Sequence, residues 1–284
     1  MGKAANFGDL PEEYSAKANA AVVIIPVPYD HTSTWIKGAD KGPMAIIEAS
    51  AHMELYDIET DSQIYQKGIF TAEAVDNEQL SERMVEEVRK QVHHNIESGK
   101  FVVVVGGEHS VSIGSIQAHI AKDKNISVLQ LDAHCDMRDE YEGSKYNHAC
   151  VMARISELCP IVQVGIRSMD ASEKTAVDES RILYAGEIYR SDNWIEKVKS
   201  KLSDKVYLTI DLDVFDPSIM PSTGTPEPGG LLWYDVLRLL KAVVESKEVV
   251  GFDVVELCPD ERNKAPDFLA AKLIYKLLSY KFKD

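Results

Sequence analysis

The feature that most restricts the fold of this 284-residue chain is a series of short apolar runs separated by longer amphipathic segments. Several runs are apolar at nearly every position instead of alternating, as strands are when helices cover both faces of their sheet. The runs are residues 21–27, 68–71, 101–105, 126–131, 161–166, 182–185, 206–210 and 249–255. Helix candidates between them are residues 81–97, 192–202, 231–247 and 266–280.

This alternation predicts one α/β domain over residues 1–284, with a mostly parallel sheet of about eight strands. The sequence contains no linker, repeat or low-complexity tract that divides it. The one long irregular segment, residues 214–230, holds four prolines and three glycines. A loop of that length in a compact domain is usually functional or disordered, so we expect it to form the rim of a site.

Potential metal ligands and other polar groups follow four of the apolar runs, at the point where each run ends. These residues are His109, Asp132, His134, Asp136, Asp211, Asp213 and Glu256. Ligands bind beyond the carboxyl ends of parallel strands, so we expect these side chains to meet at one edge of the sheet. Residues two apart in an extended segment point the same way, which favours Asp132 with His134 and Asp211 with Asp213 as ligand pairs.

Four aspartates this close would repel each other strongly unless cations lay between them. Asp132, Asp136, Asp211 and Asp213 carry four negative charges, which two divalent cations would balance. Two ions that clamp one water lower its pKa toward neutrality and so produce a nucleophile. A donor set with mostly oxygens and only two imidazoles suits Mn²⁺ better than Zn²⁺. The sequence therefore predicts a hydrolase with two Mn²⁺ ions.

Other interpretations of these segments fail on detail. A calcium loop starting at Asp211 would need a ligand where Phe215 stands. A haloacid-dehalogenase-type phosphatase would leave residues 132–136 unexplained, and the glycine motifs of nucleotide sites and the serine-hydrolase elbow are absent from the sequence. Within the motifs, we expect Glu108 to support its loop or cap a helix, and Cys135 to pack in the core.

Charge and cysteine usage restrict the partners and the compartment. With 31 basic and 46 acidic side chains, the formal net charge of −15 disfavours nucleic acid and anionic membrane surfaces and suits a small cationic substrate. Four cysteines without a C-x-x-C pair, and no apolar run near the roughly 20 residues of a membrane span, favour a cytoplasmic protein.

Three motifs, residues 106–110, 132–136 and 211–217, resemble the signatures of the ureohydrolase (arginase/agmatinase) family in order and in position after strands. The similarity extends to residues 38–43 and 255–259, so it covers nearly the whole chain, and it is greatest to agmatinases. The resemblance implies a three-layer α/β/α fold, two manganese ions and a homotrimer or homohexamer.

The resemblance also implies roles for the site residues. One ion would be held by His109, Asp132, Asp136 and Asp211, and the other by Asp132, His134, Asp211 and Asp213. Asp136 would relay a proton to the leaving amine, and His148 matches the catalytic histidine, which can shuttle protons near neutral pH. Glu256 would hold the substrate guanidinium with paired hydrogen bonds.

The loop after the second motif favours agmatine as the substrate, with urea and putrescine as products, and hence a role in polyamine biosynthesis. Residues 139–143 are similar to agmatinases, and their acidic groups favour a terminal ammonium over a carboxylate. Arg138 could instead hold the carboxylate of guanidinobutyrate or another guanidino acid such as arginine, and aminopropylagmatine is also open. A deacetylase-like or formimino-group metallohydrolase and a non-catalytic regulator are the alternatives outside this chemistry.

Overall fold

The computed structural model describes residues 6–76 and 80–283, and all eight apolar runs form strands of one sheet. The strands are β1 (Val22–Val27), β2 (Ile69–Thr71), β3 (Phe101–Gly106), β4 (Ile126–Leu131), β5 (Ile161–Ile166), β6 (Ile182–Tyr184), β7 (Lys205–Asp211) and β8 (Glu248–Val255). Every neighbouring pair of strands in the sheet is parallel. The order across the sheet is β2-β1-β3-β8-β7-β4-β5-β6.

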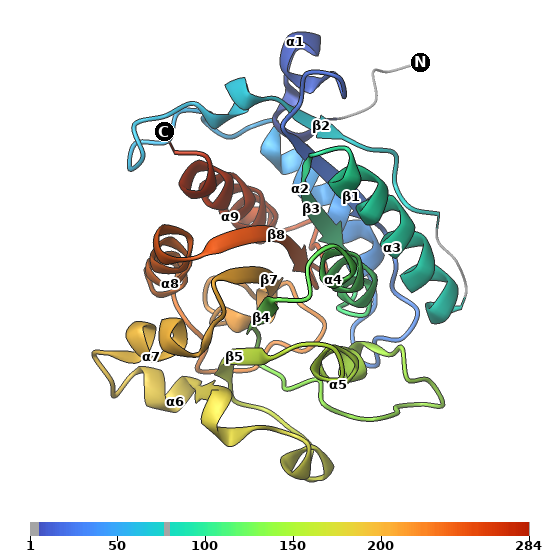
Figure 1. Cartoon of the computed structure of the whole chain (residues 1–284), viewed down its shortest axis with the longest axis vertical. Coiled ribbons are helices and arrows are strands. Elements are labelled where there is room, and N and C mark those ends of the chain that lie inside the picture. Colours follow the sequence, from blue (N-terminus) through green and yellow to red (C-terminus); the bar gives the residue numbers. More distant parts are fainter. Residues whose placement is uncertain (1–5, 77–79, 284) are drawn as a thin grey trace.

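Helices cover both faces of the sheet, which confirms the expected three-layer α/β/α fold (Figure 1). The helices are α1 (Glu12–Ser15), α2 (Gly42–Ser50), α3 (Ser81–Glu97), α4 (Val111–Lys122), α5 (Val151–Ser156), α6 (Ala185–Ile188), α7 (Trp194–Lys201), α8 (Trp233–Ser246) and α9 (Ala265–Lys281). One apolar core lies between the sheet and α2, α7, α8 and α9, and the other lies between the sheet and α3, α4 and α5. In the described ranges, no helix is both long and apolar enough to cross a membrane.

Helix α4 was not among the helices expected from sequence, and its packing explains why. Most of its residues are buried, so it lacks the polar face that produces a clear helical period. Gly114 lets α3 approach its backbone closely, because a Cβ atom there would lie 2.3 Å from the carbonyl oxygen of Val85. A helix buried this fully is recognised from its contacts and not from its pattern.

The strands that carry the candidate ligands are neighbours in the middle of the sheet. In spatial order they are β3, β8, β7 and β4, although they are the third, eighth, seventh and fourth strands of the chain. Their carboxyl ends therefore deliver His109, Glu256, the 211–213 segment and the 132–136 segment to one place. This is the edge at which parallel α/β sheets bind ligands.

Gly107 joins the end of β3 to this site through very close backbone packing. Its N–H donates to the carbonyl of Val27 at 2.8 Å, and its own carbonyl accepts from the N–H of Glu256 at 2.7 Å. A Cβ atom on Gly107 would lie 2.0 Å from the carbonyl oxygen of Tyr29, which is backbone and cannot rotate away. Only glycine fits here without moving one of the two chains.

We predict that Gly107→Ala lowers the free energy of unfolding by about 2 kcal/mol, because the added methyl group forces two backbone segments apart. The matched control is Gly186→Ala in α6, where a Cβ atom would meet nothing within 4 Å. Urea unfolding of both variants measures the difference. Equal stability of the two variants would contradict the packing described for Gly107.

Candidate metal centre

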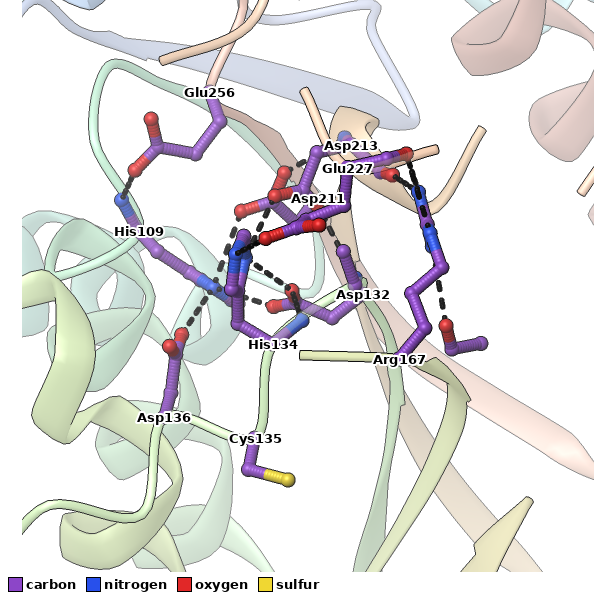
Figure 2. A network of polar contacts seen from close by, with 12 residues as sticks. His109, Asp132, His134, Cys135, Asp136, Arg167, Asp211, Asp213, Glu227 and Glu256 are labelled. Atoms are coloured by element: carbon purple, nitrogen blue, oxygen red, sulfur yellow. Dashed lines mark hydrogen bonds and ion pairs between the residues drawn. The ribbon is translucent and has the colours of Figure 1, made fainter. Parts of the chain in front are cut away.

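Carboxylates at the end of β7 and just after β4 surround the ring of His109, which follows β3 (Figure 2). The Nδ1 atom of His109 lies 2.9 Å from Oδ2 of Asp136, 3.1 Å from Oδ2 of Asp132 and 3.6 Å from Oδ2 of Asp211. All four residues are buried. One imidazole nitrogen is thus enclosed by three carboxylate oxygens from two different strands.

A second group of the same kind lies beside the first. The Nδ1 atom of His134 is 2.8 Å from Oδ2 of Asp213 and 3.6 Å from Oδ1 of Asp132. The two oxygens of Asp132 therefore face different histidines, Oδ2 toward His109 and Oδ1 toward His134. A carboxylate in that position can bridge two cations.

The donor atoms fit a pair of divalent cations. Ligand atoms of His109, Asp132 and Asp211 lie within 4.8 Å of one another, and so do those of Asp132, His134 and Asp213. Although three carboxylates surround it, the buried Nδ1 of His109 makes no hydrogen bond to them of acceptable geometry. Imidazole and carboxylate donor atoms that converge on one point are what a metal ion needs.

The other ring nitrogen of His109 is held in a way that suits a ligand. Its Nε2 lies 2.9 Å from Oγ1 of Thr209, whose hydroxyl donates to Oδ1 of the buried Asp253 at 2.7 Å. Because the Thr209 proton is used by Asp253, the threonine oxygen accepts from Nε2–H. Nδ1 then keeps its lone pair for the cluster, as in histidines that bind metals.

In the absence of cations, this cluster binds protons strongly. Burial opposes a charge on His134, but the carboxylates of Asp213 and Asp132 outweigh it and raise the pKa of His134 to about 12. Burial and the charge of Asp132 raise the pKa of Asp136 to about 7. Cations would therefore compete with protons for the same lone pairs.

Glu256 follows β8 and lies next to the cluster, as expected. Its Oε1 accepts from the backbone N–H of His109 at 2.7 Å, and the carboxylate is buried. Its backbone has a φ of 68°, and that of Asp136 has a φ of 52°. Left-handed backbone costs free energy for a glutamate, is better tolerated by an aspartate, and is often found at functional sites.

His148 lies at the start of a short 3-10 turn, and its environment differs from the sequence expectation in one respect. Burial, with the nearby positive charges of His134 and His109, lowers the pKa of His148 to about 4. The ring is therefore neutral at pH 7, whereas the sequence suggested titration near neutral pH. Sequence could not reveal this because burial of the ring depends on the surrounding loops.

A cavity of about 320 Å³ opens onto the cluster. Its walls include His109, His134, Asp136, Arg138, His148, Asp211, Asp213 and Glu256, together with Trp35, Tyr141, Asp170, Gly224 and Thr225. The presence of Gly224 and Thr225 agrees with the expectation that residues 214–230 form the rim. All the predicted site residues except the deeper Asp132 thus face one space.

Arg138 faces this cavity, and its contacts decide whether it can hold a substrate carboxylate. Its guanidinium lies over the ring of Tyr141, 4.2 Å from the ring centroid. Its Nη2 lies 3.9 Å from Oδ2 of Asp170. The positive charge is therefore shared with an aromatic face and a carboxylate, which leaves it less available to a substrate carboxylate.

Arg167 is a site residue that sequence reasoning missed. Its guanidinium contacts five backbone carbonyls, 2.6 Å from Asp213, 2.8 Å from Glu227, 3.1 Å from Gly165, 3.2 Å from Pro228 and 3.3 Å from Phe215. It thus ties the 214–230 loop to the backbone of Asp213 (Figure 2). Its position directly after β5 was the one available signal.

The two neighbours inside the motifs take the expected structural roles. The Glu108 carboxylate is buried and accepts from the backbone N–H groups of Thr32 and Ser33, so it supports a loop. Cys135 is buried in the apolar core beneath α3, α4 and α5.

Comparison with known proteins gives consistent results. The model of the arginase family matches residues 20–279. The N(1)-aminopropylagmatine ureohydrolase of a Synechocystis species is 41% identical, over 95% of this chain and 92% of that protein. The agmatinase of Pyrococcus horikoshii is 34% identical, over 92% of each chain. The crystal structure of the agmatine ureohydrolase of Thermoplasma volcanium has a TM-score of 0.89 and 29% identity, with 100% of this chain and 96% of that chain covered.

We predict that the metal-free protein loses stability as the pH rises from about 6 to about 9. The pKa values of His134 and Asp136 are raised in the folded state, so the folded state binds more protons than the unfolded state and loses that advantage as the pH rises. Stabilisation by added Mn²⁺ should instead grow over the same range, because cations replace the protons. Thermal unfolding with and without Mn²⁺ measures both trends, and a Mn²⁺ effect that is independent of pH would contradict them.

Proposed function

This chain belongs to the arginase family, whose ureohydrolases act on guanidino compounds, and we propose that it removes urea from a guanidino polyamine. The observation that carries the proposal is the position of Glu256. A buried carboxylate that hydrogen-bonds the backbone of His109 puts a guanidinium acceptor directly beside the carboxylate–imidazole cluster. A guanidinium bound there has its central carbon next to the cluster.

We propose that the cluster holds two Mn²⁺ ions, on the ligand sets implied by the family resemblance. The proposed ligands are His109, Asp132, His134, Asp136, Asp211 and Asp213. Asp132 and Asp211 are the proposed bridges. Ions bound there would lower the pKa of water and supply a nucleophile near neutral pH. The oxygen-rich donor set supports Mn²⁺ over Zn²⁺.

Glu256 is proposed to orient the substrate. One of its oxygens already accepts from the N–H of His109, which fixes the plane of the carboxylate. A Cβ atom on Gly224 would lie 3.7 Å from the other oxygen, Oε2, so the absence of a side chain there keeps that oxygen accessible. A planar guanidinium can then donate to Glu256 in a defined orientation.

Two residues are proposed to handle protons. Asp136 lines the cavity and its Oδ2 lies 2.9 Å from Nδ1 of His109, so its carboxylate is placed to relay a proton to a leaving amine. His148 lines the same cavity, and because burial lowers its pKa to about 4 the ring is neutral near pH 7, with one ring nitrogen that carries a lone pair and can accept a proton transiently. In this proposal Asp136 gives a proton to the leaving amine, and His148 accepts one.

The outer cavity suits a cationic tail. Trp35 presents an aromatic ring to the space, while Tyr141 and Asp170, which also line it, are engaged by Arg138. Aromatic faces attract ammonium groups. We propose N(1)-aminopropylagmatine ahead of agmatine, supported by the higher identity to the Synechocystis relative than to the Pyrococcus agmatinase. The products would be urea and the matching polyamine, in the cytoplasm, from a homotrimer or homohexamer.

We predict urea release with Mn²⁺ in the order aminopropylagmatine, agmatine, then guanidinobutyrate and arginine. The last two carry a carboxylate, and Arg138, a cation that lines the outer cavity, is already engaged by Tyr141 and Asp170. Values of kcat/KM for the four substrates measure the order. A preference for arginine would contradict this account of the outer cavity, and no urea from any guanidine would exclude the proposed function.

We also predict that Asp211→Asn lowers kcat by about 100-fold or more, because it removes one charge from a proposed bridge between two cations. The control is Asp204→Asn, a fully exposed aspartate next to the start of the same strand. Bound Mn²⁺ per chain should fall for Asp211→Asn and stay unchanged for the control. Near-normal turnover of Asp211→Asn would exclude the two-metal assignment.

A further inference from the structure

A short chain of hydrogen bonds joins the buried carboxylate of Glu108 to the ring of His148 through Thr32. The Thr32 hydroxyl lies 2.6 Å from Oε1 of Glu108 and 3.1 Å from Nδ1 of His148. The backbone N–H of His148 also reaches the Thr32 oxygen, at 3.0 Å. Thr32 thus contacts both the backbone and the ring of the proposed proton acceptor.

Glu108 fixes Thr32 in turn. Its Oε2 accepts from the backbone N–H of Thr32 at 2.5 Å and from that of Ser33 at 3.2 Å. Its Oε1 accepts from the hydroxyls of Thr32 and Ser110, the latter at 2.5 Å. The carboxylate is completely buried, so these four donors from two segments are the environment that satisfies it.

Because the Thr32 hydroxyl has a single proton, its hydrogen bonds decide which ring nitrogen of His148 is protonated. A threonine hydroxyl has one proton and two lone pairs. Its proton goes to Glu108, and one lone pair accepts from the backbone N–H of His148. The remaining lone pair faces Nδ1, so Nδ1 must carry a proton for the contact to be a hydrogen bond. The lone pair of the neutral ring is then on Nε2.

We propose that Thr32, held by Glu108, is a positioning residue that keeps His148 in the Nδ1–H tautomer, so that Nε2 is the atom that accepts protons in the cavity. This inference rests on the proposed function for the role of His148, but the tautomer itself is a property of the resting protein. Thr32 does not line the cavity, so it acts through His148 and not on the substrate.

A second chain of hydrogen bonds from a buried carboxylate through a threonine to a histidine lies at His109. Thr209 donates to buried Asp253 and accepts from Nε2–H of His109. Thr32 donates to buried Glu108 and accepts from Nδ1–H of His148. Each threonine links a buried carboxylate to one histidine by hydrogen bonds, but the two rings are protonated at opposite nitrogens. His109 therefore keeps the lone pair of Nδ1 for the cluster, and His148 keeps the lone pair of Nε2 for the cavity.

The test is a nitrogen NMR measurement on the full-length chain labelled with [¹⁵N]histidine, in Mg²⁺ to avoid the paramagnetism of Mn²⁺. The spectrum of His148→Asn identifies the signals of His148. At neutral pH we expect a protonated Nδ1 and an unprotonated Nε2. In Thr32→Val, which keeps the shape and loses the hydroxyl, we expect the proton to move wholly or partly to Nε2. Thr32→Ser, which keeps the hydroxyl, should restore the original tautomer.

With the Mn²⁺ enzyme, Thr32→Val should lower kcat by about 10- to 100-fold, and Thr32→Ser should recover most of that loss. KM should change by no more than about twofold, because Thr32 does not touch the substrate. A wild-type His148 protonated at Nε2, or a Thr32→Val spectrum with an unchanged tautomer, would overturn the proposal. If no guanidine yields urea, the proposed function fails while the NMR result still decides the tautomer. If Thr32→Val does not fold, the wild-type and Thr32→Ser spectra decide it.

Discussion

The mutual repulsion of buried carboxylates is the constraint on which the rest of this structure depends. Asp132, Asp136 and Asp211 lie around one imidazole nitrogen, and Asp213 lies at the next imidazole. Such a group is unstable without counter-charges, so the fold supplies backbone N–H groups and two imidazoles, and leaves converging lone pairs for cations. The left-handed backbone at Asp136 and Glu256 and the close packing at Gly107 also restrict the chain, and the rest of the fold stabilises these conformations.

The polar residues behind the cluster explain how flexible side chains keep fixed orientations. Asp253 acts through Thr209 on His109, and Arg167 holds the backbone of Asp213 together with the 214–230 loop. None of these groups brings a new reactive atom to the cavity. Their effect is to reduce the number of orientations and protonation states that the reactive groups can adopt, which is how surrounding residues tune a metal site.

Much of the fold could be read from apolar patterning, and the failures have physical causes. The strands were predicted because parallel strands are apolar on both faces, and helix α3 was predicted with the bounds that the structure shows. Helix α4 was missed because burial on most sides removes its helical period. Thr32 and Arg167 were missed because a threonine or an arginine in a loop has no distinctive spacing, and their partners are far away in sequence.

The sequence by itself determined the fold class, the family and the set of charged residues after each strand, because apolar periodicity and short motifs are local properties. Only the tertiary structure decided that β3, β8, β7 and β4 lie side by side, since strand order depends on crossovers that leave no mark on a strand's own residues. It also decided that Arg138 is engaged by Tyr141 and Asp170, and that burial lowers the pKa of His148. Partners, burial and pKa are properties of the surroundings that other parts of the chain create.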